Sequence, residues 1–259
     1  MQLVRRLYPY KDLFLVFTWR EFTIRYRQSI FGILWAILQP LSMMILFTFI
    51  FSYVLKIKLT EYPNVLFFYA GLLPWTFFSS SLNYSVFSLS NQYDLITKIY
   101  FPREIIPLSG ISIALLDYLI ASLIFWIMLL VYKIHITWNV LWIVPLFILL
   151  FLFTTSMSLL LSSINVYYRD VKLATGFLIQ LLFFASPVIY STDRIEKKLK
   201  VILFLNPLTF IIENMRRCIL EGRGVIPWQF ITVSLIIGFI YFLSYRFFIR
   251  MERDFADVI

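Results

Sequence analysis

The chain has 259 residues, of which 61% are hydrophobic and 14% are charged, and its mean hydropathy is +0.85. A soluble domain carries about a quarter charged residues, so this composition excludes an ordinary soluble protein. The formal net charge of +9 would suggest a nucleic-acid partner in a soluble protein, but in a membrane protein it is typical of contacts with lipid headgroups. We therefore predict an all-α polytopic membrane protein that contacts membrane lipids and binds no nucleic acid.

Residues 1–29 precede the first long apolar stretch and predict an amphipathic helix. Four apolar side chains share one face, within about 60° on a helical wheel: Leu15, Trp19, Phe22 and Tyr26. Four charged side chains lie on the other side: Arg20, Glu21, Arg25 and Arg27. Phe17 and Ile24 depart from this pattern. Such a helix would lie in the cytoplasmic interface of the membrane, although the arginines could instead serve only to set the topology.

Six later stretches are long and apolar enough to cross a bilayer, since about 20 apolar residues span its hydrocarbon core. They are Ile30–Leu55, Val65–Ser90, Ile105–Tyr132, Val140–Ile164, Leu173–Tyr190 and Trp228–Ile249. An even number of spans places both ends of the chain on one side of the membrane. That side carries thirteen Lys and Arg residues, against three in the opposite short loops and seven in residues 191–227. Because positive charge is enriched in cytoplasmic loops, we expect both termini in the cytoplasm.

The whole chain, residues 1–259, is predicted to be one transmembrane domain. Spans one to five occupy residues 30–190, and the sixth span with a cytoplasmic tail occupies residues 228–259. Between them, Asn206 and Pro207 divide residues 191–227 into two apolar pieces, each too short to cross. Re-entrant backbone is tolerated only where protein or water satisfies its polar groups. We therefore predict re-entrant helices at the outer face.

Polar residues enter the second and third spans. Polar side chains in a membrane avoid lipid and face a bundle interior or a water-filled cavity. The candidate channel-lining residues are Ser79, Ser80, Asn83, Tyr84 and Asp117. Close packing through small serines is the alternative for the second span. For Asp117, the alternative is a protonated acid hydrogen-bonded to a neighbouring helix.

Motifs for catalysis and nucleotide binding are missing from the sequence. None of the seven glycines begins a G-x-x-x-x-G-K-[ST] phosphate loop, and neither H-E-x-x-H nor G-x-S-x-G occurs. A single cysteine, Cys218, and a single histidine, His135, exclude an internal disulfide framework and a zinc site of cysteine and histidine. We expect no enzymatic activity and no cofactor or metal in this chain, so another chain must supply energy for any active transport.

Several stretches together resemble the permease subunits of polysaccharide-exporting ABC transporters, of the O-antigen and teichoic-acid kind. The first, I-R-Y-R-Q-S-I-F-G-I-L-W-A-I-L-Q-P-L, resembles the opening motif of that family. The stretch L-L-P-W-T-F-F-S-S-S-L-N resembles the entry to the second span in that family. The stretch L-I-T-K-I-Y-F-P-R-E-I-I-P-L-S resembles the family's first cytoplasmic loop. Later landmarks follow in the same order as Y-Y-R-D-V-K, S-P-V-I-Y and N-P-L-T-F-I-I-E-N-M-R-R. The resemblance covers essentially the whole chain.

The resemblance implies a homodimer in the bacterial inner membrane, with a channel at the dimer axis. It also implies two copies of a separate nucleotide-binding ATPase, which would bind ATP and Mg²⁺. The cargo would be a polysaccharide on undecaprenyl diphosphate, moved outward. Two other classes stay open: an exporter of drugs or lipids from the same superfamily, and a membrane-embedded enzyme of lipid-linked glycan assembly that uses Asp117, Asp193 or Glu213.

Within this frame, three further sets of residues receive roles. Residues expected to couple to the ATPase lie in a short helix and the chain after it: Tyr93, Leu95, Ile96, Lys98, Ile99, Tyr100, Phe101, Arg103 and Glu104. Arginines that match phosphate oxygens are candidates for the cargo diphosphate: Arg5, Arg6, Arg20, Arg25 and Arg27. The periplasmic gate is assigned to Asn206, Pro207, Arg216 and Arg217, with the two arginines facing outer headgroups or cargo.

Overall fold

The computed structural model describes residues 6–27, 29–168 and 170–255, and this part of the chain is helical without any strand. The α-helices are α2 (Lys11–Tyr26), α3 (Trp35–Phe49), α4 (Asn64–Ser85), α5 (Tyr93–Lys98), α6 (Ile105–Val131), α7 (Ile143–Tyr167), α8 (Val171–Ala185), α9 (Lys197–Leu203), α10 (Pro207–Arg216) and α11 (Pro227–Met251). Two π-helical turns, Ile50–Val54 and Arg217–Glu221, continue α3 and α10. The 3-10 turns are Tyr8–Tyr10, Gly32–Leu34, Ser90–Gln92, Trp138–Trp142, Thr192–Arg194 and Glu252–Asp254.

Five helical segments are long and apolar enough to cross a membrane. They are Gly32–Val54, Asn64–Gln92, Ile105–Val131, Trp138–Tyr167 and Pro227–Asp254. These segments correspond to five of the six stretches predicted from the sequence. The chain is therefore a multi-pass membrane protein.

The remaining predicted span, Leu173–Tyr190, extends beyond the end of the helix that the structure contains there. Its helix, α8, has 15 residues and ends at Ala185. At a rise of about 1.5 Å per residue it is roughly 22 Å long, shorter than a hydrocarbon core of about 30 Å. The reason is Pro187, because the residue before a proline is disfavoured in helical conformation. Ser186 is accordingly extended, with φ −109° and ψ 147°.

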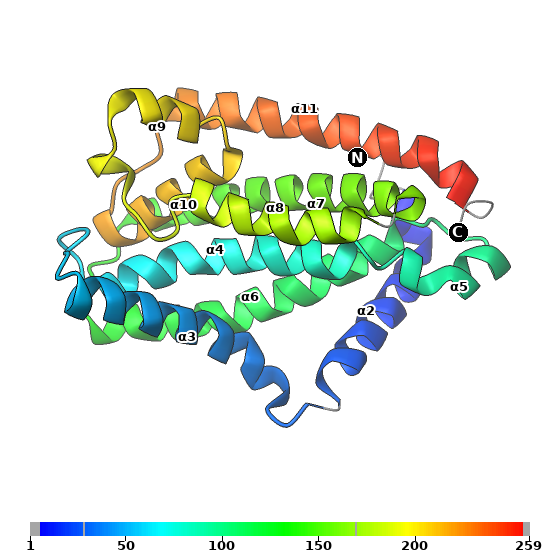
Figure 1. Ribbon diagram of the computed structural model, residues 1–259, viewed down its shortest axis with the longest axis horizontal. Coiled ribbons are helices and arrows are strands. Elements are labelled where there is room, and N and C mark those ends of the chain that lie inside the picture. Colours follow the sequence, from blue (N-terminus) through cyan, green and yellow to red (C-terminus); the bar gives the residue numbers. More distant parts are fainter. Residues whose placement is uncertain (1–5, 28, 169, 256–259) are drawn as a thin grey trace.

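Helix α4 is the centre of the bundle. It packs against α3, α6, α7, α8 and α10, and α7 in turn packs against α11. Figure 1 shows α4, α6, α7, α8 and α11 running roughly along the long axis of the molecule, while α2 crosses obliquely. Aromatic side chains of α4 fill the space between these helices, and Phe67, Phe68, Phe77 and Phe78 are each at most 1% exposed.

Both ends of the described chain meet at one end of the bundle. Arg6 Nη2 lies 2.8 Å from Glu252 Oε2, so the segment before α2 contacts the segment after α11. Helix α5 lies at this end too, whereas α9 and α10 lie toward the opposite end (Figure 1). We refer to these as the α5 end and the α10 end. The chain therefore runs an even number of times between them.

Helix α2 forms where the sequence predicts it, but its buried face differs from the predicted apolar stripe. Leu15 and Trp19 are exposed, whereas Tyr26 is buried. Phe17, which lies off that stripe, is buried and its ring centroid is 5.7 Å from that of Phe101. Helix α2 therefore has apolar side chains on two sides, and one of these sides packs on the rest of the bundle. Its position at a membrane interface stays a prediction.

Candidate functional site

One polar stripe on α4 is only partly covered by the rest of the described chain. Apart from Val65 in its first turn, every α4 residue that is not buried belongs to this stripe: Thr76, Ser79, Ser80, Asn83 and Tyr84. Successive members are three or one residues apart, which places them on one face of a helix. A central helix that is otherwise covered thus presents a polar face. All four predicted channel-lining residues of the second span lie on it.

The remaining serines of this region have a packing role. Ser81, Ser85 and Ser88 are buried, and the Ser85 hydroxyl donates to the Ser81 carbonyl at 2.6 Å. On this side α6 approaches closely at Gly110, where a Cβ atom would lie 3.2 Å from the Ser85 backbone nitrogen. The packing interpretation therefore applies to this face of α4, whereas channel lining by the other face stays a prediction.

An ion pair lies beside the open stripe and joins three helices. Asp117 of α6 has Oδ2 3.0 Å from Arg25 Nη2, and its Oδ1 accepts a hydrogen bond from the Tyr26 hydroxyl of α2. The Arg25 guanidinium also lies over the ring of Tyr84 in α4, 4.4 Å from its centroid. The opposite charge of Asp117 and the cation–π contact with Tyr84 both stabilise the Arg25 guanidinium between these helices. Arg25 is thus engaged inside the chain, whereas the sequence predicts a contact with the cargo diphosphate.

A small space connects this ion pair with the α4 stripe. It measures about 20 Å³ and is lined by Arg25, Gln39, Ser80 and Asp117 among others. That is room for about one water molecule. Arg25 Nη1 is buried and makes no hydrogen bond within the described residues, so a water here would satisfy it. Polar groups from α2, α3, α4 and α6 therefore meet at this space, among apolar side chains such as Ala36, Phe77 and Ala114.

A second polar cluster lies at the α5 end. Arg6 bridges two carboxylates, with Nη1 2.8 Å from Glu104 Oε1 and Nη2 2.8 Å from Glu252 Oε2. The backbone N–H of Arg103 donates to Glu252 Oε1 at 3.0 Å. Glu104 is fully buried, and this burial together with the charge of Glu252 raises the pKa of Glu104. Arg6 thus holds the α5–α6 loop, whereas the sequence predicts a contact with the cargo diphosphate. Arg5 lies outside the described residues.

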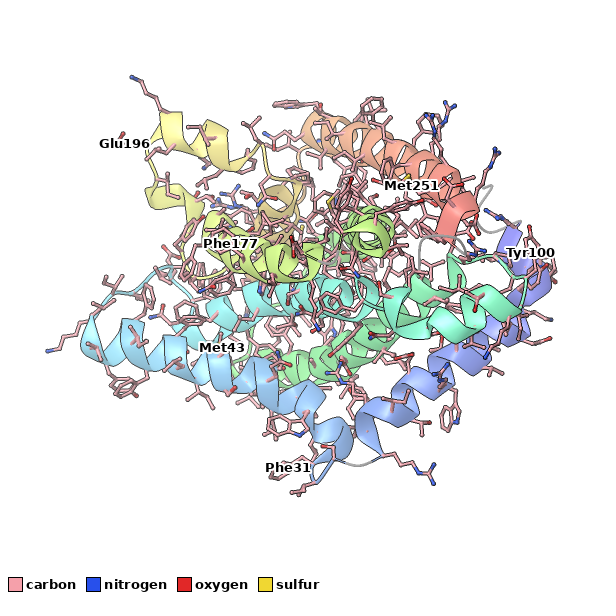
Figure 2. The ribbon with its side chains drawn as sticks, turned by 45° about the vertical axis from the view of Figure 1, so that its right-hand side comes forward. Phe31, Met43, Tyr100, Phe177, Glu196 and Met251 are labelled. Carbon is pink, nitrogen blue, oxygen red and sulfur yellow. The ribbon has the colours of Figure 1, made fainter. Side chains whose placement is uncertain are left out.

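The predicted coupling residues divide into a buried group and an exposed group. Ile96 and Phe101 are 2% and 4% exposed, whereas Ile99 and Tyr100 are 58% and 85% exposed. Figure 2 shows Tyr100 at the surface of the α5 end. Leu95 and Arg103 are half-buried, Glu104 is buried, and Lys98 is exposed. Among the coupling residues whose side chains the structure describes, Ile99 and Tyr100 are the apolar ones accessible to a partner; the Tyr93 side chain lies outside the described part.

This division gives a testable difference between two neighbouring aromatic residues. Phe101→Ala removes a buried ring and should lower the free energy of unfolding by about 3 kcal/mol. Tyr100→Ala should leave the unfolding free energy within about 0.5 kcal/mol of wild type, because its ring is exposed. Thermal or denaturant unfolding of the purified chain measures both. Equal destabilisation by the two variants would contradict the assignment of Phe101 to the core.

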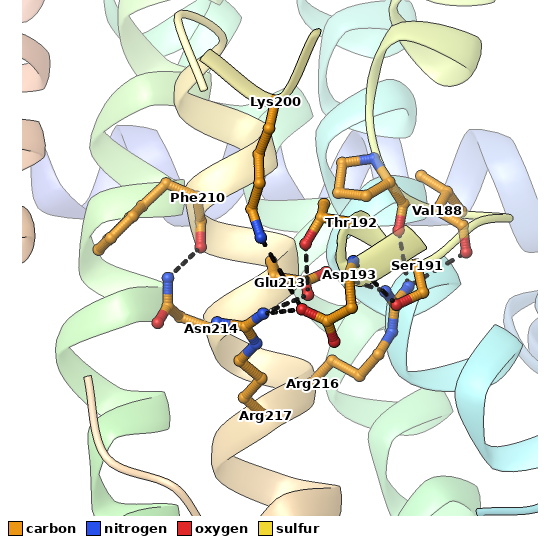
Figure 3. Close-up of polar contacts among 11 residues, drawn as sticks. Val188, Ser191, Thr192, Asp193, Lys200, Phe210, Glu213, Asn214, Arg216 and Arg217 are labelled. Carbon is orange, nitrogen blue, oxygen red and sulfur yellow. Dashed lines mark hydrogen bonds and ion pairs between the residues drawn. The ribbon is translucent and has the colours of Figure 1, made fainter. Parts of the chain in front are cut away.

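The third polar cluster lies at the α10 end (Figure 3). Arg216 is 3% exposed, and its Nη2 donates to the Pro187 carbonyl at 2.7 Å and the Val188 carbonyl at 3.1 Å. Its Nη1 lies 3.3 Å from Glu213 Oε2, and its guanidinium lies 3.8 Å from the ring centroid of Phe67. The expectation that Arg216 faces headgroups or cargo is therefore wrong for this structure. It clamps the turn after α8 onto α4 and α10, since those carbonyls are left free where Pro187 ends the helix.

The rest of this cluster fixes the start of α10 and links it to residues 191–193. Arg217 Nη2 lies 2.8 Å from Asp193 Oδ1 and 3.2 Å from Glu213 Oε1. Asn206 caps α10 by accepting the Leu208 N–H at 3.0 Å, with Pro207 in the first turn. The predicted break at Asn206 and Pro207 is confirmed. The gating role of this segment stays a prediction.

Residues 12–220 match the protein family described as ABC-2 type transporter. The chain belongs to the ABC-2 type transporter family. The match runs from α2 through α10 and so covers the α4 stripe, the Arg25–Asp117 pair and the Arg216 cluster.

Relatives in this ABC-2 family cover nearly the whole chain. An O-antigen export system permease protein RfbA from Klebsiella pneumoniae is 32% identical over 96% of this chain and 95% of its own length. A protein of the same name from Myxococcus xanthus is 32% identical over 86% of each chain. The polysialic acid transport protein KpsM from Escherichia coli is 26% identical over 88% of this chain and 90% of its own. These ABC-2 relatives are named as permease or transport proteins.

Proposed function

We propose that this chain is the permease subunit of an ATP-driven exporter that moves a lipid-linked polysaccharide of the O-antigen type across the bacterial cytoplasmic membrane. The observation that carries the proposal is the open polar stripe on α4. Polar side chains at the centre of a membrane protein face other protein or water. A second copy facing the same stripe would enclose a polar passage between two chains. Tyrosine and serine hydroxyls on such a surface suit sugar hydroxyls, and aromatic faces suit sugar C–H groups.

The proposed topology has six crossings with both termini in the cytoplasm. Five long helices alone would leave the chain ends on opposite sides. The Arg6–Glu252 contact at the α5 end supports an even number, and in this scheme α8 with residues 186–190 would supply the sixth crossing. The α5 end is the cytoplasmic end in this scheme. The excess of Lys and Arg in the segments assigned to the cytoplasm supports this orientation.

The energy for export comes from a separate ATPase that binds ATP and Mg²⁺, with two copies beneath the permease dimer. Ile99 and Tyr100 would contact it, since buried aromatic anchors dominate many interfaces. The test is affinity purification of the chain together with the ATPase encoded beside it. We expect the two proteins to form a stable complex, and we expect the permease purified without the ATPase to hydrolyse no ATP.

Tyr100→Ala should weaken complex formation without changing permease stability. Assembly and export at wild-type levels in Tyr100→Ala would remove this segment from the coupling mechanism.

The cargo diphosphate is assigned to the arginines that stay exposed, Arg20 and Arg27. A guanidinium fork binds phosphate oxygens in a bidentate way that lysine cannot reproduce. The double variant Arg20→Lys with Arg27→Lys should therefore lower export and cargo-stimulated ATPase activity severalfold, while membrane insertion is unchanged. Full activity in this variant would leave both residues as topology and headgroup anchors only.

Residues 191–227 are assigned to a periplasmic gate. Asn206 and Pro207 separate its two helices, and Arg216 and Arg217 fasten α10 from within. Cysteines introduced into α9 and cross-linked between two copies should block export. Efficient cross-linking without loss of export would remove the gate role.

The acids considered for an enzyme are all engaged. Asp117 pairs with Arg25, Asp193 pairs with Arg217, and Glu213 contacts both Arg216 and Arg217. These ion pairs favour structural roles. They support transport over membrane-embedded catalysis.

A further inference from the structure

A groove of about 450 Å³ lies between α9, α10 and α11 at the α10 end, separate from the α4 stripe. Three residues of α11 follow one another along it at intervals of four: Trp228, Thr232 and Ile236. This spacing covers about 12 Å of helix length on one face. Phe210, which is 1% exposed, lines the groove from the interior of the bundle, and Phe204 lines it from the end of α9. The groove is therefore elongated and mainly apolar.

The position of α11 relates this groove to the membrane. Pro227–Asp254 is one of the five segments able to cross a bilayer, and Trp228 lies in its first turn. Trp228 is 66% exposed, and tryptophan is enriched where a span meets the membrane–water interface. The groove thus begins at an interface and continues along α11 into the hydrocarbon region. Its volume is within the usual range for small-ligand pockets, and its lining suits an acyl chain.

The groove also has a positive charge at its rim. Lys200 lines it, and its Nζ lies 3.8 Å from Asp193 Oδ1. The same oxygen lies 2.8 Å from Arg217 Nη2, and Glu213 contacts both Arg216 and Arg217, so the three basic groups of this cluster exceed its two acids by one positive charge. Residues 191–227 as a whole carry seven basic and four acidic side chains. An anionic ligand with an apolar tail matches both features.

We propose that this groove binds one acyl chain of an anionic phospholipid, with the lipid phosphate at the Lys200 ammonium group. The proposal rests on α11 being a membrane span and does not depend on the transported cargo. Other possible occupants are a zwitterionic phospholipid, the isoprenoid carrier and a second copy of this chain. Tighter binding of phosphatidylethanolamine than of phosphatidylglycerol would indicate the first, tighter binding of an isoprenoid phosphate the second, and a change in oligomeric state without lost lipid binding in Thr232→Trp the third.

The test is lipid binding to the purified chain in detergent, followed by native mass spectrometry. Phosphatidylglycerol is the anionic probe, and phosphatidylethanolamine is the zwitterionic one. We expect Lys200→Glu to weaken phosphatidylglycerol binding by about tenfold or more, because a basic residue is replaced by an acidic one beside a phosphate. Lys198→Glu is the matched control, since Lys198 is exposed on the same helix and does not line the groove.

A second pair of variants tests the acyl-chain site. Thr232→Trp should fill the groove and reduce the binding of both phospholipids, whereas Ile231→Trp, on a neighbouring exposed position outside the groove, should not. Equal phosphatidylglycerol affinity in the two lysine variants would overturn the headgroup assignment. Unchanged lipid binding in Thr232→Trp, with or without a change in oligomeric state, would overturn the site itself. Tighter binding of undecaprenyl phosphate than of phosphatidylglycerol, lost in Thr232→Trp, would overturn the choice of a phospholipid.

Discussion

Gly71→Ala is expected to lower the free energy of unfolding by about 3 kcal/mol, although it adds a single methyl group. Gly71 lies in α4 where the Arg216 guanidinium and the turn after α8 meet the helix. A Cβ atom at this position would collide with Arg216 Nη2 and lie 2.9 Å from the Val188 carbonyl oxygen. The backbone cannot move aside easily, because Arg216 itself holds Pro187 and Val188. Thermal unfolding of the purified protein measures the loss.

Two other glycines provide matched controls for this variant. Gly176 in α8 and Gly238 in α11 have open space where a Cβ atom would lie, with nothing within 4 Å. Alanine is favoured over glycine within a helix by about 1 kcal/mol, so Gly176→Ala and Gly238→Ala should be neutral or slightly stabilising. A Gly71→Ala protein as stable as these controls would contradict the close packing of Arg216 against α4.

Arg25→Met should also be strongly destabilising, by about 3 kcal/mol, because it leaves the Asp117 carboxylate without its counter-charge inside the bundle. The double variant Arg25→Met with Asp117→Leu should recover much of this loss. Replacement of a buried ion pair by apolar residues is often close to neutral, whereas removal of one partner is not. A double-mutant cycle by thermal unfolding gives the coupling between the two residues.

Arg27→Met is the matched control for this cycle. Arg27 is exposed near the end of the same helix, so its replacement should change the unfolding free energy by less than about 0.5 kcal/mol. If Arg25→Met unfolds at the wild-type temperature, or if the double variant is no more stable than the single one, Arg25 and Asp117 are not paired in the folded protein.

Hydropathy and length predicted five of the crossing helices because these properties depend on local sequence. The error in α8 also has a local cause, since Pro187 ends the helix and apolar residues continue beyond it. The α10 start was predictable from Asn206 and Pro207 for the same reason. Local patterns thus accounted for most elements of the fold.

The roles of the arginines could not be predicted in this way. Arg216 binds carbonyl groups 28 and 29 residues earlier in the chain, and Arg6 pairs with Glu252, 246 residues later. The sequence alone suggests phosphate as the partner of these guanidinium groups, because partners so distant along the chain cannot be recognised without the fold. For Arg25 a usable signal existed, namely an acid inside a span with an arginine just before another span. The serine-rich part of α4 posed a similar problem, since only the fold shows which face stays open.

The most direct test of a passage along the α4 stripe is export through a protein with a single accessible cysteine on it. The native Cys218 is 1% exposed, so the wild type serves as the unreactive control. In the Asn83→Cys variant, we expect a bulky water-soluble thiol reagent to stop ATP-dependent export of the lipid-linked polysaccharide by the reconstituted permease–ATPase complex. Ser85→Cys, on the buried face of α4, should export normally after the same treatment. Export at the wild-type rate by a fully modified Asn83→Cys protein would contradict a passage along the α4 stripe.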